Sequence, residues 1–334
     1  MTTGTRQPVH GWAVAHDGEP GPLLRECLEA AVLAPSIFNT QPWRFRPTSA
    51  GVDVLADRGR RVGVIDEYGR ELLISVGAAV FNLRVAMLAR GRQAVLSLLP
   101  DGPHAERVAC VRAGARVAGS DTVAALARAI PRRRTNRRPF ADVPVERWMI
   151  DELVRAAEAE GAELTVADLD ARGAVLEVVR FAERRWRAQP NYLAALEWWT
   201  RCDIGRLDGV PPEAYGPWSA AERMPLRDFG LVHPLRKRAV ERFEDTSTIA
   251  VLSTRTDGPE AWLRGGQALE RVLLTATVRG LATTPLTQPL EIPALRALVC
   301  GPGTTRHPQA IIRIGYGPPC APSPRRPLAE VLLR

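Results

Sequence analysis

Lysine is nearly absent from this chain of 334 residues. It occurs once, at Lys237, although lysine and arginine together number 45. A phosphate-binding loop of the Gly-Lys-Ser/Thr type is therefore missing, and a pyridoxal Schiff base would have only Lys237 to use. Almost all of the positive charge is carried by arginine, whose planar guanidinium group binds carboxylates and phosphates through paired hydrogen bonds.

Patterns of metal-binding and disulfide-forming residues are also missing. The five cysteines form no Cys-x-x-Cys pair, and the five histidines show no His-x-x-x-His spacing. Neither a zinc site nor a disulfide scaffold follows from such scattered residues. We expect no metal.

Long apolar runs are absent too. The longest, around Leu72 to Leu83, is too short to cross a bilayer, and the first ten residues are polar and lack the apolar core of a secretory signal. The sequence thus predicts a soluble cytoplasmic protein with no membrane partner.

The composition is that of an ordinary globular protein, with 46% hydrophobic and 25% charged residues. The net charge of +8 and the pI near 9.9 permit nucleic-acid binding. The arginines are spread along the whole chain, however, and no nucleic-acid reading motif is recognisable. We expect no nucleic-acid partner.

Two long stretches of the chain repeat each other. Residues 71–91 and 260–280 match at a constant offset of 189, with identical residues at five positions, which in the first copy are Glu71, Gly77, Ala79, Arg90 and Gly91. Each stretch follows a helix that starts near a proline, at 22–34 and at 144–160. The pattern predicts two related α/β halves, 1–130 and 131–334, with the long helices as pseudo-symmetric partners at their junction.

One segment, residues 185–245, has no counterpart in the first half. It holds four of the eight tryptophans. An insertion rich in aromatic residues with a Pro/Gly turn is typical of a lid over a site, although an ordinary subdomain would use aromatics in the same way. The candidate lid residues are Tyr192, Trp198, Trp199, Tyr215 and Trp218.

Two polar segments are candidates for ligand binding. Residues 132–140 (RRRTNRRPF) carry five arginines within seven positions, which suits a phosphate monoester. Residues 35–43 (PSIFNTQPW) place Ser, Asn, Thr and Gln between two prolines, and their amides suit a uracil-like edge. The alternatives are a solvated basic linker for the first segment and a polar turn for the second.

Together these segments resemble two signatures of the nitroreductase superfamily of FMN proteins. Residues 133–137 match Arg-x-Ser/Thr-x-Arg/Lys, and residues 35–43 match the more specific Pro-Ser-x-x-Asn-x-Gln-Pro-Trp. The similarity is greatest to the Acg-like branch, whose chains are similarly long, fused and lidded. The resemblance implies an α+β fold of two fused halves, with mixed sheets flanked by helices.

The order of the signatures is reversed relative to ordinary nitroreductases, in which two subunits exchange them to build each FMN site. The resemblance therefore implies a dimer fused into one polypeptide, with one complete site. A monomer acting as a pseudo-dimer is the expected state.

By this resemblance, Arg133, Thr135 and Arg137 would hold the FMN phosphate and the N1–O2 edge, with Arg134 inside the same motif. Arg325 and Arg326 would complete the phosphate site. Ser36, Asn39 and Gln41 would meet the ring and ribityl chain. Backbone N–H groups at Leu286 and Thr287 would face flavin N5.

The implied activity is transfer of two electrons from NAD(P)H through FMN to a small-molecule acceptor, such as a nitroaromatic or a quinone. No side chain is expected to act as an acid or base, because the flavin carries the chemistry. A protein that holds the flavin with little turnover is the alternative, since a closed lid would exclude the nicotinamide.

Overall fold

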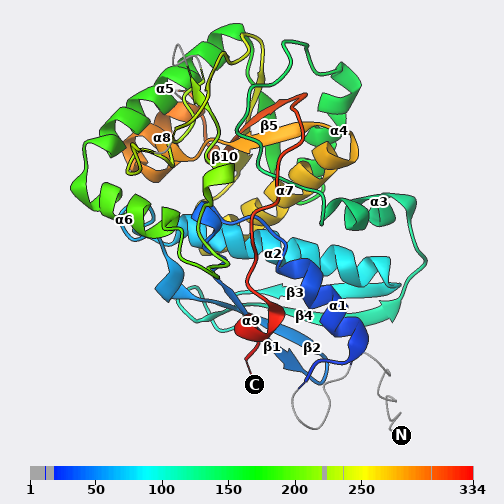
Figure 1. The fold of residues 1–334 in the computed structure, drawn as a ribbon. Helices are drawn as coiled ribbons and strands as arrows, with labels where there is room; N and C mark the ends of the chain where they lie inside the picture. The colour runs from blue at the N-terminus through cyan, green and yellow to red at the C-terminus, as the bar shows by residue number, and fades with distance from the viewer. Residues whose placement is uncertain (1–11, 13–18, 220–223, 236, 302, 334) are drawn as a thin grey trace, which may run out of the picture.

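The computed structural model describes residues 12, 19–219, 224–235, 237–301 and 303–333. In Figure 1 two sheets lie at opposite sides of a central layer of helices. The first unit runs α1 (Pro22–Ala31), β1 (Trp43–Thr48), β2 (Gly51–Ala56), α2 (Arg70–Ala89), β3 (Arg92–Leu98) and β4 (Arg107–Arg116). The short helix α3 (Asp121–Ala129) leads from it to the second unit.

The second unit repeats this order of elements. It runs α4 (Arg147–Glu158), β5 (Glu163–Val166), β8 (Thr248–Thr254), α7 (Pro259–Val278), β9 (Ala282–Pro285) and β10 (His307–Gly315). The strand order is β1-β2-β4-β3 in one sheet and β5-β8-β10-β9 in the other. Element by element, the two orders are the same, and the α+β class is confirmed.

The sheets differ from the prediction in one respect, because neighbouring strands in both four-stranded sheets are antiparallel rather than mixed. Each long helix does join two strands that run in the same direction. A later strand, β4 or β10, lies between those two strands and pairs with both. The helical crossover therefore produces no parallel neighbours.

Helices α2 and α7 cross in close contact at the centre of the molecule (Figure 1). A Cβ atom at Gly77 would lie 2.3 Å from the carbonyl oxygen of Leu263, and one at Gly266 would lie 2.0 Å from that of Ile74. Leu263 follows Ile74 by the same offset of 189 that relates the two glycines. The contact is therefore reciprocal, as in an isologous interface.

Helix α2 is the one described helix that is long and apolar enough to cross a membrane, but 83% of its apolar window is buried inside the protein. It is buried by the first sheet and α1 on one side and by α7 on the other, in two core clusters that meet at this helix. Its length and apolar character are thus those of a core helix.

The extra segment of the second unit lies between β5 and β8, at positions where β1 and β2 are joined by a two-residue turn. It contains α5 (Leu169–Arg187), α6 (Pro190–Thr200) and the short parallel pair β6 (Trp218–Ser219) and β7 (Val240–Glu241). The predicted boundary at residue 185 falls inside α5, so the extra segment begins earlier than predicted. We call residues 167–247 the insertion.

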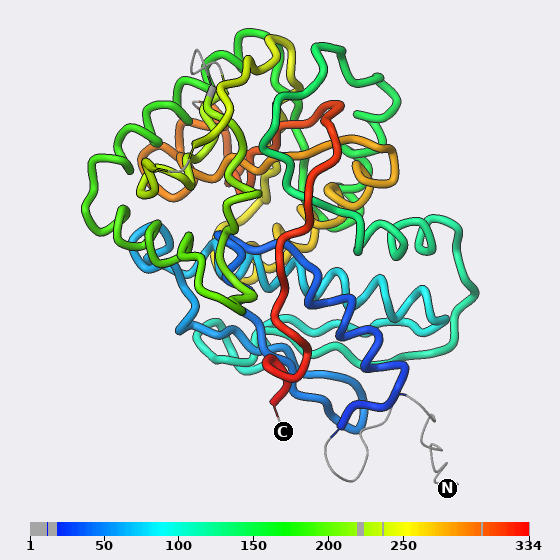
Figure 2. The backbone as a smooth tube through the Cα atoms, in the orientation of Figure 1, coloured from blue at the N-terminus to red at the C-terminus, as the bar shows by residue number. Residues whose placement is uncertain are grey.

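The C-terminal segment crosses from the second unit back to the first. After β10 it descends past the helical layer to α9 (Leu328–Val331), as the red trace in Figure 2 shows. There the N–H of Leu333 donates to the carbonyl of Phe45 in β1 at 2.8 Å. This path brings residues 320–326 alongside the loop that precedes β1.

Candidate functional site

The arginine segment is extended and pairs with the start of β9. Thr135 forms a parallel bridge with Thr283, and the N–H of Asn136 donates to the carbonyl of Thr283 at 2.9 Å. Alternate side chains of an extended segment lie on one face. Arg133, Thr135 and Arg137 accordingly face the same hollow, whereas the Asn136 amide donates to the carbonyl of Pro318 at 2.7 Å.

That hollow, which we call the arginine cavity, contains about 740 Å³ of space. Seven predicted binding residues from three separate segments line it: Ser36, Asn39, Arg133, Arg134, Thr135, Arg137 and Arg325. The structure thus brings the two predicted signatures and the C-terminal segment to one place.

The arginine cavity has an excess of positive charge. Glu270, which is fully buried, lies 3.6 Å from the Nε of Arg133, and burial raises the pKa of Glu270 to about 7. Burial, together with the neighbouring Arg133, lowers the pKa of Arg325 to about 9, although part of its side chain faces the cavity. Among the described residues, no hydrogen-bond partner is found for the buried Nε atoms of Arg133 and Arg325, and the contact of Arg133 with Glu270 is an ion pair only. Such groups suit a bound anion.

The loop before β1 is strained. Three non-glycine residues have positive φ angles: Phe38 at 48°, Asn39 at 55° and Gln41 at 51°. Each such residue costs on the order of 1–3 kcal/mol, and the strain persists only where surrounding contacts hold it. One of those contacts is the Ser36 hydroxyl, which accepts a hydrogen bond from the Gln41 N–H at 2.9 Å.

The amides of Asn39 and Gln41 also hold this loop to distant parts of the chain. Asn39 donates to the carbonyls of Gly209 and Pro324 and accepts from Arg325. Gln41 donates to the carbonyl of Leu207 and accepts from the N–H of Arg326. Gln41 is fully buried and does not line the cavity, so its polar groups serve the loop rather than a face open to a ligand.

A second hollow, the central cavity, continues from the arginine cavity. Pro35, Ser36, Thr135 and Arg137 line both, so the two cavities adjoin at these residues. The central cavity contains about 750 Å³, and its walls come from the strained loop, α2, α7, the insertion and the segment after β9. Most of its lining is apolar, with Glu71, Arg137 and Arg227 as its charged residues.

The insertion covers Arg137 directly. The Arg137 guanidinium donates to the carbonyl of Ala214 at 2.9 Å and lies 4.6 Å from the centre of the Phe229 ring. A Cβ atom at Gly216, whose φ is 79°, would lie 2.6 Å from the Arg137 carbonyl oxygen. Burial and the charge of Arg227 lower the pKa of Arg137 to about 10, which leaves it protonated at neutral pH.

The five aromatic residues predicted to form the lid face line neither of these two cavities. Tyr192, Trp199 and Tyr215 are buried in a core cluster of the insertion, and Trp198 and Trp218 are largely exposed. They pack the insertion onto the first unit instead. The insertion residues that do line the central cavity are Leu226, Arg227 and Phe229.

Of the remaining predicted residues, one lines a cavity and two do not. Thr287 lines the central cavity, but the Leu286 side chain is buried and its N–H donates to the carbonyl of Ile311 at 2.8 Å, which leaves it unable to face a ligand. The Arg326 side chain lies outside both cavities and pairs with Glu330 at 3.1 Å. Arg326 and Glu330 are four residues apart, and this ion pair directs the Arg326 side chain away from the cavities.

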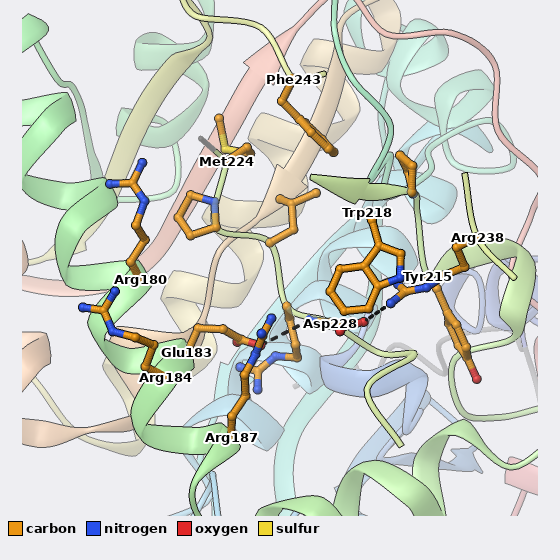
Figure 3. A pocket seen from close by; sticks show the side chains of 14 residues that line it. Arg180, Glu183, Arg184, Arg187, Tyr215, Trp218, Met224, Asp228, Arg238 and Phe243 are labelled. Carbon is orange, nitrogen blue, oxygen red and sulfur yellow. Dashed lines mark hydrogen bonds and ion pairs between the residues drawn. The ribbon is translucent and has the colours of Figure 1, made fainter. Parts of the chain in front are cut away.

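A third cavity lies beside the central one, inside the insertion. Figure 3 shows Arg180, Arg184 and Arg187 of α5 on one side of it and the Trp218 ring on the other. Leu226 and Arg227 line both this cavity and the central one. A single layer of insertion residues therefore separates the central cavity from a second, arginine-rich opening.

Sequence reasoning did not find Glu71, Arg227 or Phe229 as site residues. Arg227 and Phe229 lie in the insertion, where no motif marks them. Glu71 carried a usable signal: it is an acidic residue at the start of an otherwise apolar helix, and such a residue is rarely buried without a purpose.

No family model matches the sequence. Among curated proteins, Rv3127 of Mycobacterium tuberculosis, which is uncharacterized, is 36% identical over 327 residues, covering 93% of this chain and 92% of its own. Rv3131 of the same organism, named as a proposed NAD(P)H nitroreductase, is 36% identical over 92% of this chain and 90% of its own. The acg protein of M. tuberculosis is also named as a proposed NAD(P)H nitroreductase. It is 32% identical, covering 92% of this chain and 95% of its own. This chain belongs to the Acg-like branch of the nitroreductase superfamily.

Solved structures of nitroreductases match parts of this Acg-like protein. The NfnB enzyme of a Sphigopyxis strain has 19% identity and a TM-score of 0.39, covering 62% of this chain and 96% of its own. A Bacteroides fragilis nitroreductase has 13% identity and a TM-score of 0.36, covering 58% of this chain and 88% of its own. The family assignment rests on the full-length relatives.

Proposed function

We propose that this protein is an FMN-dependent oxidoreductase that takes two electrons from NAD(P)H and passes them to a nitroaromatic, a quinone or another small acceptor. The observation that carries the proposal is the pair of adjoining cavities, one rich in arginine and the other largely apolar, which share Ser36, Thr135 and Arg137 as lining residues. FMN has the same division, with a phosphate at one end and an aromatic ring at the other. The names of the full-length relatives and of the FMN-bound neighbour support it.

The residues present fit this cofactor. Arg133, Arg134 and Arg325 line the arginine cavity and supply guanidinium donors where a phosphate would lie. Arg137, held between Ala214 and Phe229, places a fixed positive charge at the junction of the cavities, where it would stabilise negative charge on a ring. FMN, when bound, supplies the hydride and electron chemistry, and the protein supplies position and electrostatics.

We also propose that the two halves, 1–130 and 131–334, act as a fused pseudo-dimer. This proposal is supported by the strand order that the two sheets share and by the reciprocal helix contact at Gly77 and Gly266. The strained loop of the first half and the arginine segment of the second then form one site between them. A cytoplasmic location, where NAD(P)H is supplied, belongs to the same proposal.

A flavin-holding protein with little turnover is the second candidate. It is favoured by the insertion, whose Ala214, Gly216 and Phe229 pack on Arg137 and whose Arg227 lines the central cavity. An insertion that stays closed would keep a nicotinamide from reaching the distance of about 3–3.5 Å that hydride transfer needs.

Two measurements separate these functions. The purified protein, supplied with FMN, should bind it and show a flavin absorbance spectrum; a protein that takes up no FMN would contradict both candidates. Anaerobic mixing with NADPH or NADH then distinguishes them. Rapid bleaching of the flavin supports the oxidoreductase, whereas bleaching by dithionite but not by either nucleotide supports the flavin-holding protein.

A further inference from the structure

A buried wall of charged residues separates the central cavity from a second hollow that opens on the far side. This outer cavity contains about 1440 Å³ of space, and Asp66, Arg70 and Glu291 line it. Glu71 and Arg227 line the central cavity. Five charged side chains from the start of α2, the short helix at Gln288–Glu291 and the insertion therefore stand between the two spaces.

The contacts within this wall are well defined. The Asp66 carboxylate accepts hydrogen bonds from the N–H groups of Glu71 and Leu72 at 2.9 and 3.0 Å, which fixes the start of α2. Arg70 pairs with the Glu71 carboxylate. Arg227 pairs with Glu291 at 2.5 Å. Four of the five charged side chains are thus held in two ion pairs, and Asp66 is held by the helix.

The wall contains more acids than bases. Asp66, Glu71 and Glu291 face Arg70 and Arg227, and little of any of these five side chains is exposed. With every group ionised the buried set would carry one uncompensated negative charge, which is costly in a low-dielectric interior. Retaining one proton removes that charge. Burial raises the pKa of Glu71 to about 7, with the charges of Glu291 and Asp66 adding to it and Arg70 and Arg227 opposing it.

We propose that Glu71 carries a proton from the water of the outer cavity to an acceptor that is reduced in the central cavity. This inference rests on the proposed function and names a residue for its second half-reaction. Two-electron reduction of a quinone to a hydroquinone adds one hydride and one proton. Bound FMN, once reduced, would supply the hydride, and the O–H bond of the Glu71 carboxyl would break as its proton passes to a quinone oxygen. The Glu71 carboxylate that remains takes a proton from water by way of the outer cavity.

The chain offers a matched control for Glu71. Its counterpart at the offset of 189 is Glu260, at the start of α7, which is exposed and pairs with Arg264 at 2.8 Å. Glu71→Gln leaves two acids facing two bases in the wall, so the buried set stays neutral and the fold should persist. Glu71→Asp keeps a carboxyl group at the same position.

The test uses the full chain loaded with FMN, reduced anaerobically with dithionite and mixed with menadione in a stopped-flow instrument. Flavin reoxidation is followed from about pH 5.5 to about pH 8.5. The wild-type rate constant should fall as the pH rises through 7, because Glu71 loses its proton. In Glu71→Gln the rate should be independent of pH and roughly a hundredfold lower at the acidic end. Glu71→Asp should retain a pH-dependent rate, and Glu260→Gln should match the wild type.

The outcomes distinguish this inference from the function on which it rests. A protein that takes up no FMN overturns both. If Glu71→Gln binds FMN and is reoxidised at the wild-type rate at every pH, the oxidoreductase stands and the role of Glu71 is refuted. A wild-type rate that does not change with pH refutes it as well. If Glu71→Gln does not hold FMN, the test rests on Glu71→Asp. A rate of flavin reoxidation that is independent of pH in Glu71→Asp would then refute proton donation by Glu71.

Discussion

At the scale of single residues, the feature that distinguishes this site is buried positive charge with too few partners. Arg133 and Arg325 share one acid, Glu270, and each keeps a buried Nε atom without a hydrogen-bond partner. Leaving a buried donor unsatisfied costs about 1–3 kcal/mol, and more for a charged group. In the proposed site a bound phosphate would add negative charge beside these arginines, so we expect FMN to stabilise this corner of the molecule.

Arg325 and Arg326 provide a paired test of the phosphate assignment. They are adjacent in sequence, but Arg325 lines the arginine cavity and Arg326 pairs with Glu330 outside it. Arg325→Ala removes a charge-assisted contact worth about 1.5–3 kcal/mol, so FMN affinity should fall roughly ten- to a hundredfold. Arg326→Ala should leave it nearly unchanged. Fluorescence titration measures both.

Riboflavin, which lacks the phosphate, makes the Arg325 test specific. Its affinity should change little in Arg325→Ala. Equal losses for FMN and riboflavin would show that Arg325 supports the loop through Asn39, to which it donates at 2.8 Å, rather than the phosphate. Arg133 is a poorer choice for this test because its removal would leave Glu270 buried without its nearest partner.

At the scale of elements, the crossing of α2 and α7 sets the distance between the two units. Side chains at Gly77 or Gly266 would overlap with the backbone of the opposite helix, and backbone cannot move aside as a flexible side chain can. Glycine in a helix costs about 1 kcal/mol relative to alanine, so its presence at both positions reflects this close approach.

Gly265 and Gly266 are neighbours in α7 and differ in what a side chain would meet. At Gly266 the Cβ atom would lie 2.0 Å from the Ile74 carbonyl oxygen, whereas at Gly265 the nearest atom, in the side chain of Gln309, would be 3.1 Å away. Gly266→Ala should lower the free energy of unfolding by about 3 kcal/mol. Gly265→Ala should be close to neutral. Urea denaturation of both variants checks this, and equal effects would contradict the close crossing.

The sequence was most informative about these regular elements. The predicted long helices 71–91 and 260–280 correspond to α2 and α7 within two residues at each end, because their apolar periodicity and terminal glycines are local signals. Both polar signatures were also recognised. Their side-chain partners were not, because Asn39 and Gln41 bond to residues 166 to 286 positions away.

The insertion shows the limit of composition as a guide. Its aromatic residues predicted a lid surface, but Tyr192, Trp199 and Tyr215 lie in a core cluster that joins the insertion to the first unit. Aromatic side chains bury large apolar areas and therefore serve packing as readily as ligand contact. Which insertion residues reach the central cavity depends on the path of residues 224–235, for which the sequence contains no periodic signal.

At the scale of the whole molecule, the two halves are alike in architecture and unlike in what lies between them. Each long helix ends at an arginine that pairs with the helix preceding its own sheet: Arg90 with Glu26 at 2.6 Å, and Arg279 with Glu152 at 2.6 Å. These pairs are equivalent positions of the proposed repeat. The scaffold is thus preserved on both sides of the molecule, and any difference in function must arise from the residues that line the sites.

The positions that would form the symmetry-related counterpart of the central cavity carry different residues. Ala78 of α2 and Leu273 of α7 line the central cavity, and their counterparts at the offset of 189 are Gln267 and Arg84. Arg84 donates to the Gln267 side chain at 2.7 Å and pairs with Glu160 at 2.6 Å. The Arg84–Gln267 pair, with Glu160 as its acidic partner, thus stands where the central cavity has the small Ala78 and the apolar Leu273.

One FMN per polypeptide, on a single chain of 36.5 kDa, is therefore the expected composition in solution. In the proposed pseudo-dimer the contact between the two halves is internal, between α2 and α7, so we expect that no second chain is needed to complete the site. Light scattering after size-exclusion chromatography gives the mass, and the flavin absorbance of the same peak gives the number of FMN molecules per chain. Two FMN per chain would mean that the Arg84–Gln267 pair opens to form a second site. A dimer that loses its FMN on dilution to monomers would mean that the site is completed by a second copy.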